Sequence, residues 1–309
     1  MKKLFFVSFA FDEEKLSGMN VYKSDKFNTY LKNICVSLIS AKRTTADVDV
    51  ALVCNVDVPE EYDTILKNNG VLIFKESFDS FLFKNNYPWC LAFYKLCALG
   101  KMIDKGYDYY VYTDADVYVQ SSLENVFEEL QDNILLYDIN HGLGVKDYRI
   151  IGDEFVNFGV SKYTTHYGGE FFGASRDNAK DFLSECFSVY EEMLKKDFVT
   201  TKGDEFILSV AASRMKTKIK NAGAYIFRFW TGRFYLVSTC YKYNEVSILH
   251  LPDEKEKGML RLYNYFLKKQ SFPKKEKVHK ICHLSRKSKT VLIKSFLLKI
   301  SGRNLKSKK

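Results

Sequence analysis

Asp114 and Asp116, two aspartates one residue apart, are the side chains in this chain best suited to do chemistry. They directly follow residues 109–113, a run of β-forming residues. Carboxylate oxygens at this spacing, at the end of a strand, can bind one divalent cation together. A cation held there neutralises phosphate oxygens and so makes a diphosphate a better leaving group. The tripeptide alone is equally typical of a solvated turn, so the surrounding elements must distinguish the two interpretations.

The chain before these aspartates alternates between strand-like and helix-like segments. Apolar, β-rich runs predict strands at residues 4–10, 48–56 and 71–74. Helical periodicity and end signals predict helices at residues 27–39, 60–68 and 89–103. This alternation predicts an α/β fold with a mainly parallel sheet. Ligands of such sheets bind beyond the carboxyl ends of the strands, where Asp114 and Asp116 would lie.

The second half of the chain is less regular. Residues 140–144 are typical of a loop, and residues 167–173 of a short strand bracketed by glycines. Helical patterns follow at residues 178–195 and 204–214. Residues 224–248 are rich in β-forming types and predict a strand-rich segment that leads to His250.

The sequence Y-T-D-A-D-V at residues 112–117 resembles the metal-binding motif of GT-A glycosyltransferases, and S-S-L-E-N-V-F at residues 121–127 resembles the segment that follows it. In element order the resemblance extends over most of residues 1 to about 260. It implies a GT-A fold in which Asp114 and Asp116 hold a metal ion and Asp114 also lies near the donor. It further implies that Lys95 reaches the donor phosphates, although a solvated helix lysine is as consistent with the pattern. The residues that it implies to lie near the nucleotide base are Ser8, Phe9, Ala10 and Phe11.

A second local resemblance concerns Asp204 and Glu205. The run Y-G-G-E-F-F-G at residues 167–173, followed by G-D-E at residues 203–205, is similar to retaining transferases of the blood-group ABO type. It implies that Asp204 binds sugar and that Glu205 lies below the anomeric carbon. A carboxylate there can stabilise an oxocarbenium-like state or accept a proton from an acceptor hydroxyl, so the stereochemistry stays open. Both acids would also suit a first helical turn for electrostatic reasons alone.

His250 is the third candidate. The segment S-I-L-H-L-P at residues 247–252, followed by Lys255 and Lys257, resembles the late histidine segment of metal-dependent GT-A enzymes. The resemblance implies that His250 completes the metal shell and that the lysines contact the diphosphate. Imidazole together with two carboxylates suits Mn²⁺. A structural histidine and solvated loop lysines remain the alternatives. Arg228, Phe229, Trp230 and Arg233 could line an acceptor pocket, with core packing as the alternative for Trp230.

These residues together predict a metal-dependent glycosyltransferase that uses Mn²⁺ or Mg²⁺. The donor would be a nucleotide-sugar, with UDP as the default, and the acceptor a glycan or glycolipid of surface polysaccharide or lipopolysaccharide synthesis. A second interpretation is a haloacid-dehalogenase-type phosphatase, which the strand before Asp114 fits loosely and in which Asp114 would be the nucleophile. A third is a carbohydrate- or membrane-binding module without catalysis.

The net charge of +9 is unevenly distributed along the chain. Residues 266–309 hold 15 Lys and Arg and one acidic residue, which leaves a body of net charge −5. The basic character therefore gives no reason to expect nucleic-acid binding by the body.

We predict a GT-A catalytic domain at residues 1–264, with a nucleotide-binding half up to about 120, and a basic helical tail at 265–309. Residues 290–300 place apolar residues beside Lys294 and Lys299, a basic amphipathic pattern found in helices that bind anionic membrane surfaces and equally in a docked terminal helix.

The seven cysteines are scattered, odd in number and form no C-x-x-C pair. They predict buried free thiols, no zinc site and a reducing, cytoplasmic compartment, where the basic tail would attach the protein to the inner face of the cell membrane. The apolar N-terminal run is short and followed at once by acidic residues, so it is expected to be the first core strand and not a signal peptide. No segment has the length and hydrophobicity expected of a membrane span.

Overall fold

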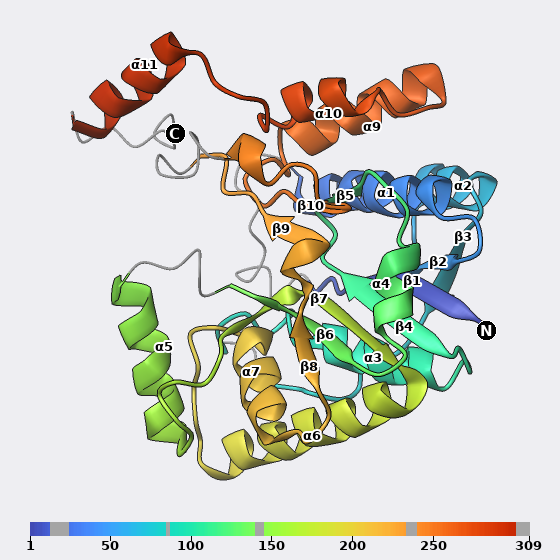
Figure 1. Ribbon diagram of the computed structural model, residues 1–309. Helices are drawn as coiled ribbons and strands as arrows, with labels where there is room; N and C mark the ends of the chain where they lie inside the picture. Colours follow the sequence, from blue (N-terminus) through green and yellow to red (C-terminus); the bar gives the residue numbers. More distant parts are fainter. Residues whose placement is uncertain (13–24, 85–86, 140–144, 233–239, 301–309) are drawn as a thin grey trace.

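The computed structural model of the protein describes residues 1–12, 25–84, 87–139, 145–232 and 240–300 (Figure 1). The predicted loop at residues 140–144 and Arg233 lie outside the described residues. The described chain folds into a seven-stranded sheet with helices on both faces, and a second sheet of three short strands.

The seven-stranded sheet is mainly parallel, as predicted. Its strands, in spatial order, are β3 (Val71–Lys75), β2 (Asp49–Cys54), β1 (Lys3–Phe9), β4 (Tyr109–Thr113), β7 (Tyr167–Ser175), β6 (Ile134–Asp138) and β8 (Ile219–Asn221). The exception is β7, which runs antiparallel to both of its neighbours, β4 and β6. The middle of β7 therefore lies beside the end of β4, so that Phe171 is opposite Thr113 and the first residues of β7 precede this pairing. The α/β class and the mainly parallel sheet are confirmed.

Two apolar layers sandwich this sheet because its strands alternate their side chains between the two faces. On one face, Phe5 and Val7 of β1 pack with α1 (Lys26–Thr44) and α2 (Glu60–Asn68). On the other face, Leu4 and Phe6 pack with α3 (Tyr94–Ile103), α6 (Arg176–Lys195) and α7 (Asp204–Arg214). Two further helices, α4 (Glu124–Glu129) and α5 (Val145–Phe158), add residues to the first and second layer respectively. The result is a three-layer α/β/α, Rossmann-like arrangement.

The small sheet lies beyond the carboxyl end of β4. Its order is β5 (Val117–Val119), β10 (Ile248–His250) and β9 (Ile226–Arg228). The register of β10 places His250 opposite both Val117 and Arg228. Asp114–Asp116 thus forms the turn by which the chain leaves the main sheet and enters the small one.

Two sequence-based boundaries differ from the structure. The predicted helix at residues 89–103 begins only at Tyr94, because residues 89–93 form turns and Trp89 has a left-handed φ of 57°. Within its described residues, 224–232 and 240–248, the predicted strand-rich segment has as strands only β9 and the first residue of β10, while Cys240–Lys242 forms a 3₁₀ helix followed by turns. Periodicity alone does not separate a short strand from an extended loop rich in aromatic residues.

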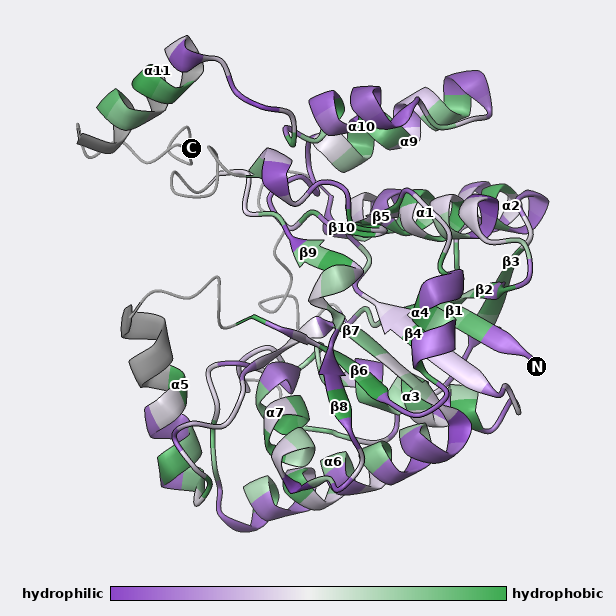
Figure 2. Ribbon diagram, viewed as in Figure 1, coloured by the Kyte–Doolittle hydropathy of each residue, from purple (hydrophilic) through white to green (hydrophobic). Residues whose placement is uncertain are grey.

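The basic C-terminal segment forms α9 (Gly258–Lys269), α10 (Lys275–Ile281) and α11 (Lys289–Ile300). The first two pack on the body beside α1, whereas α11 lies apart from them at the same end of the molecule (Figure 1). Figure 2 shows hydrophobic residues on α11 that are coloured like those of the core elements. No described helix combines the length and the apolar character needed to cross a bilayer.

Candidate metal centre

The turn that carries the two aspartates is fixed by backbone hydrogen bonds to other segments. The amide of Asp114 donates to the carbonyl oxygen of Glu170 on β7 at 3.2 Å. The amide of Leu251, directly after β10, donates to the carbonyl oxygen of Asp116 at 2.9 Å. The antiparallel strand β7 and the small sheet therefore hold this turn between them.

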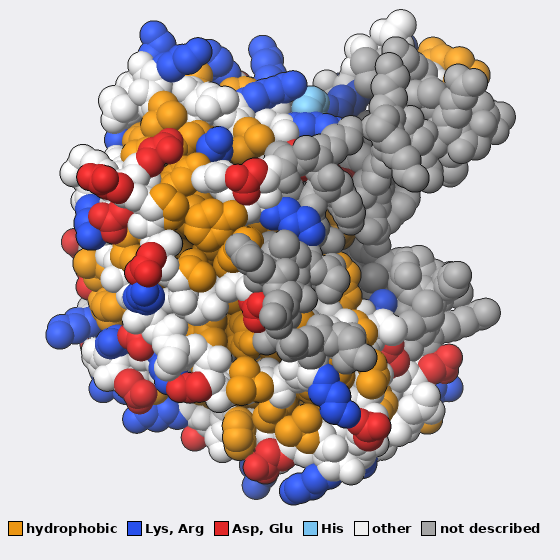
Figure 3. All heavy atoms as spheres, turned by 180° about the vertical axis from the view of Figure 1, so that it is seen from behind, with side chains coloured by type: hydrophobic (Ala, Val, Ile, Leu, Met, Phe, Trp, Pro, Cys, Tyr) orange, Lys and Arg blue, Asp and Glu red, His pale blue; other side chains and the backbone are white. Residues whose placement is uncertain are grey.

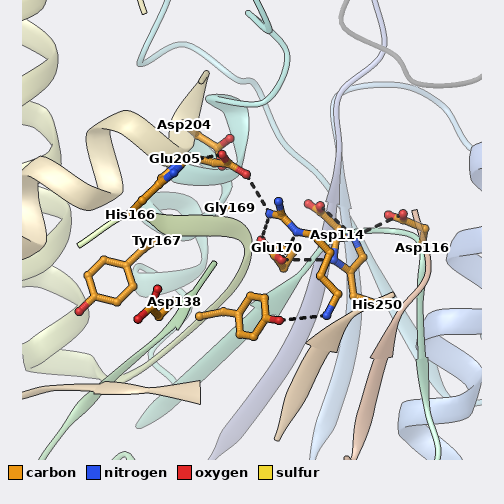
Figure 4. A network of polar contacts seen from close by, with 12 residues as sticks. Asp114, Asp116, Asp138, His166, Tyr167, Gly169, Glu170, Asp204, Glu205 and His250 are labelled. Atoms are coloured by element: carbon orange, nitrogen blue, oxygen red, sulfur yellow. Dashed lines mark hydrogen bonds and ion pairs between the residues drawn. The ribbon is translucent and has the colours of Figure 1, made fainter. Parts of the chain in front are cut away.

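Asp114, Asp116 and His250 converge on one point (Figure 4). One ligand atom from each of them lies within 4.8 Å of the other two. The Nε2 atom of His250 is 3.6 Å from Oδ2 of Asp114 and 3.4 Å from Oδ2 of Asp116. The side chains of Asp116 and His250 are only 2% and 4% exposed, and that of Asp114 is 31% exposed. The group is thus open to solvent on the Asp114 side only.

The donor set fits a hard divalent cation. Oδ2 of Asp116 and Nε2 of His250 are buried and, within the described residues, make no hydrogen bond. Their contacts within the described residues are ion pairs inside the cluster and with Lys255, and a bound cation would satisfy these buried atoms further. Two carboxylates and an imidazole are ligands that Mn²⁺ accepts readily, and the carboxylates also suit Mg²⁺.

The aspartates of the cluster lie among positively charged neighbours. Burial opposes protonation of His250, but Asp116 and Glu170 outweigh it and raise the pKa of the imidazole to about 9. Burial opposes ionisation of Asp116, but Lys255 and His250 hold the pKa of its carboxyl well below the usual range. Without a metal ion, positive charge on His250 and Lys255 therefore compensates the aspartates.

Two of the predicted lysines flank the cluster. Nζ of Lys255 lies 3.1 Å from Oδ2 of Asp116. Nζ of Lys95, on α3, lies 2.9 Å from Oδ1 of Asp114 and 2.9 Å from Oδ2 of Asp204. Burial favours the neutral amine of Lys95, but these two carboxylates raise its pKa well above the ordinary value. Lys257, by contrast, is an exposed residue at the start of α9.

Asp204 and Glu205 begin α7 on the far side of Lys95. Burial raises the pKa of Asp204 to about 6, against the opposing effect of Lys95. Lys95 also donates a hydrogen bond to the carbonyl oxygen of Gly169 at 2.7 Å, which ties α3 to β7. A Cβ atom at Gly169 would overlap the carboxylate of Asp204, so glycine is required there for close packing. Asp204 is therefore linked to the Asp114–Asp116–His250 cluster through Lys95.

Glu205 belongs to a network that contains the imidazole of His166 (Figure 4) and the guanidinium of Arg228. Arg228 donates to Oε1 of Glu205 at 2.8 Å and to both carboxylate oxygens of Glu170. Nε2 of His166 lies 3.0 Å from Oε2 of Glu205. Burial would raise the pKa of Glu205, but Arg228 and His166 outweigh it and lower the pKa to about 2. Glu205 is therefore held as a carboxylate near neutral pH.

The residues predicted to lie near a nucleotide base follow or end β1. Phe9 is buried, and its ring lies 6.2 Å from that of Phe11 and 6.0 Å from that of Tyr30. The backbone of Phe11 exchanges two hydrogen bonds with the side chain of Asn55. Ser8 and Ala10 are partly exposed at the same end of the sheet as Asp114. Of the suggested acceptor-pocket residues, Phe229 is buried in the core and Trp230 is partly buried.

Glu170 and His166 have central positions that the sequence did not assign to them, and Arg228 was placed in an acceptor pocket and not in this network. Glu170 is fully buried, with Arg228 on one side and Nδ1 of His250 at 3.3 Å on the other. A signal for Glu170 was present, since an acidic residue within an apolar strand must be paired when buried. No protein-family model and no curated protein matches this chain, so the interpretation of the site depends on its own geometry.

Proposed function

We propose that the protein is a metal-dependent glycosyltransferase of GT-A type that transfers a sugar from a nucleotide-sugar, with UDP-sugar as the first donor to test. The observation that carries this proposal is the cluster Asp114–Asp116–His250, flanked by the ammonium groups of Lys95 and Lys255. A site that combines carboxylate and imidazole ligands with two lysines suits a cation and the phosphate oxygens of a diphosphate.

Each group of the chain then has a distinct task. Asp114, Asp116 and His250 would hold Mn²⁺ or Mg²⁺, which when bound supplies positive charge to the departing diphosphate. Lys255 and Lys95 would add positive charge on either side of it. Ser8, Phe9, Ala10 and Phe11 lie at the same end of the main sheet and would contact the nucleotide base.

Asp204 and Glu205 would face the sugar. Because Arg228 and His166 keep the pKa of Glu205 near 2, this carboxylate is a poor proton acceptor at neutral pH. It is better suited to stabilise positive charge that develops at the anomeric carbon. Asp204, next to it and paired with Lys95, would accept hydrogen bonds from sugar hydroxyls.

The remaining expectations belong to the same proposal. The acceptor would be a glycan or glycolipid of surface polysaccharide or lipopolysaccharide synthesis. The seven cysteines are free and buried, which fits the reducing environment of a cytoplasmic enzyme.

The deciding experiment is a hydrolysis screen of nucleotide-sugars with the full chain, with Mn²⁺, with Mg²⁺ and with a chelator. Asp114→Asn and Asp116→Asn should each abolish metal-dependent hydrolysis of the accepted donor, with the fold retained by circular dichroism. The matched control is Asp79→Asn, which removes a surface ion pair with Lys101 and should leave the activity unchanged.

Other outcomes separate the competing functions. Phosphate-ester hydrolysis with a trapped phospho-Asp114 would favour the phosphatase. Hydrolysis of no donor, together with no metal-dependent thermal stabilisation by nucleoside diphosphates, would favour a non-catalytic module. Wild-type activity in either aspartate variant would overturn the proposed function.

A further inference from the structure

The basic C-terminal segment divides into a packed part and an exposed part. Apolar residues of α9, α10 and the residues just after them are buried in the same core as α1: Met259, Leu262, Tyr263, Phe266, Val278, Cys282 and Leu284. The packed part therefore extends about to residue 284, within the segment predicted as a separate tail. Among the described residues after 284, α11 is the only helix, and it is the one that could contact another surface.

α11 presents large apolar side chains to solvent. Ile293 and Leu297 are each 59% exposed, and Phe296 is 51% exposed. Their spacing of three and four residues places them on one face of the helix. Three large apolar residues grouped in this way typically mark a surface that another molecule or a membrane covers.

The C-terminal segment that carries this apolar face is almost entirely positive in charge. Residues 266–309 include a single acidic residue, Glu276. Exposed lysines lie along α9, α10 and the start of α11: Lys268, Lys269, Lys274, Lys277, Lys280 and Lys289. Figure 3 shows Lys and Arg side chains gathered at this end of the molecule, and hydrophobic side chains at its outermost corner. An anionic surface would complement these lysines.

We propose that α11 binds an anionic membrane surface, with Ile293, Phe296 and Leu297 inserted among the lipid headgroups and the lysines of α9 and α10 attracted to the same surface. The lysines alone would suit any polyanion, including a nucleic acid. The apolar face decides in favour of lipid, because insertion of such a face is the way amphipathic helices bind to bilayers. This membrane contact does not depend on sugar transfer and is measured without it.

The test is co-sedimentation of the full chain with vesicles. Binding to vesicles of phosphatidylcholine with phosphatidylglycerol should exceed binding to phosphatidylcholine alone, and should weaken when salt is raised to about 0.15 M or above. The triple variant Ile293→Ser, Phe296→Ser, Leu297→Ser should lower the partition coefficient by about tenfold or more. The double variant Lys268→Ala, Lys269→Ala should lower it by about tenfold.

Matched controls come from the opposite end of the molecule. Leu194→Ser removes an exposed apolar residue on α6, and Lys180→Ala with Lys195→Ala removes two exposed lysines from the same helix. These variants should bind as the wild type does. The proposal is overturned if the wild type ignores anionic vesicles, if the triple variant binds undiminished, or if DNA of equal charge concentration competes the protein off the vesicles completely.

Discussion

Oε1 of Glu170 lies 3.3 Å from Nδ1 of His250, while Nε2 of the same ring faces Asp114 and Asp116. The histidine is thus placed between a carboxylate behind it and the two candidate metal ligands in front of it. A carboxylate in this position would favour the ring tautomer that leaves Nε2 free to bind a metal ion, and it would increase the basicity of that nitrogen. Glu170 is therefore a positioning residue for the candidate metal centre.

Replacement of this carboxylate should weaken metal binding without removing a ligand. We expect Glu170→Gln to lower the affinity for Mn²⁺ by about 10- to 100-fold, as the loss of outer-shell partners does elsewhere. Because Arg228 loses a buried partner, we also expect a loss of about 3–5 kcal/mol in the free energy of unfolding. Mn²⁺ titration followed by electron paramagnetic resonance and denaturation in chelator measure the two effects separately.

The control for Glu170 is another Glu→Gln change, which removes an ion pair that includes none of the cluster residues. Glu129 lies 2.6 Å from Nζ of Lys220, and both side chains are more than a third exposed. Glu129→Gln should leave Mn²⁺ affinity unchanged and cost at most about 1 kcal/mol. Equal Mn²⁺ affinity in Glu170→Gln and the wild type would show that Glu170 has no positioning role.

The case of Glu170 shows how far the sequence could predict the fold and the site. The alternation of elements predicted the parallel strands and the strand that ends at Asp114, since these follow from local patterns. The direction of β7 is a tertiary property: only antiparallel pairing with β4 places Phe171 beside Thr113 and thus Glu170 behind His250. The contact of Arg228 with Glu205 likewise depends on the small sheet, whose strands are too short for a periodic signal.

The two consecutive glycines of β7 should tolerate no side chain. A Cβ atom at Gly169 would overlap the carboxylate of Asp204, which is buried and lies against Lys95. We expect Gly169→Ala to cost about 1–3 kcal/mol in the free energy of unfolding. It should also remove donor hydrolysis, because Asp204 must move away from Lys95. Urea denaturation and the hydrolysis assay measure these two effects.

Gly152→Ala provides the matched change in a helix. The nearest atom to its added Cβ would be the carbonyl oxygen of Lys162 at 3.6 Å, an ordinary contact distance. Alanine also has the higher helix propensity, so this variant should be neutral or slightly more stable. If Gly169→Ala behaved as Gly152→Ala does, the close packing of Asp204 against β7 would have no functional importance.

The pH dependence of stability should report on Asp204 and Glu205 with opposite signs. Burial raises the pKa of Asp204 from 3.8 to about 6, so its favourable contribution is complete below the unfolded value and is lost as pH rises through 6. Arg228 and His166 lower the pKa of Glu205 from 4.5 to about 2, so its contribution is present above 4.5 and is lost only in acid. Between about pH 4 and pH 7, the free energy of unfolding therefore changes mainly through Asp204, while the contribution of Glu205 stays nearly constant.

Asp204→Asn should remove the first of these dependences. In chelator, the free energy of unfolding of the variant should rise relative to that of the wild type between about pH 4 and pH 7, by about 2–3 kcal/mol at most. The reason is that only the wild type has to ionise a buried carboxyl over this range. Glu205→Gln should instead be less stable than the wild type by a constant amount across about pH 5–8, since Arg228 and His166 lose the charge that they face. Thermal denaturation of the three proteins over this range is the measurement. A stability difference between Asp204→Asn and the wild type that does not change with pH would mean that Lys95 fully compensates the buried carboxylate. The pKa of Asp204 would then be the same as that of an exposed aspartate.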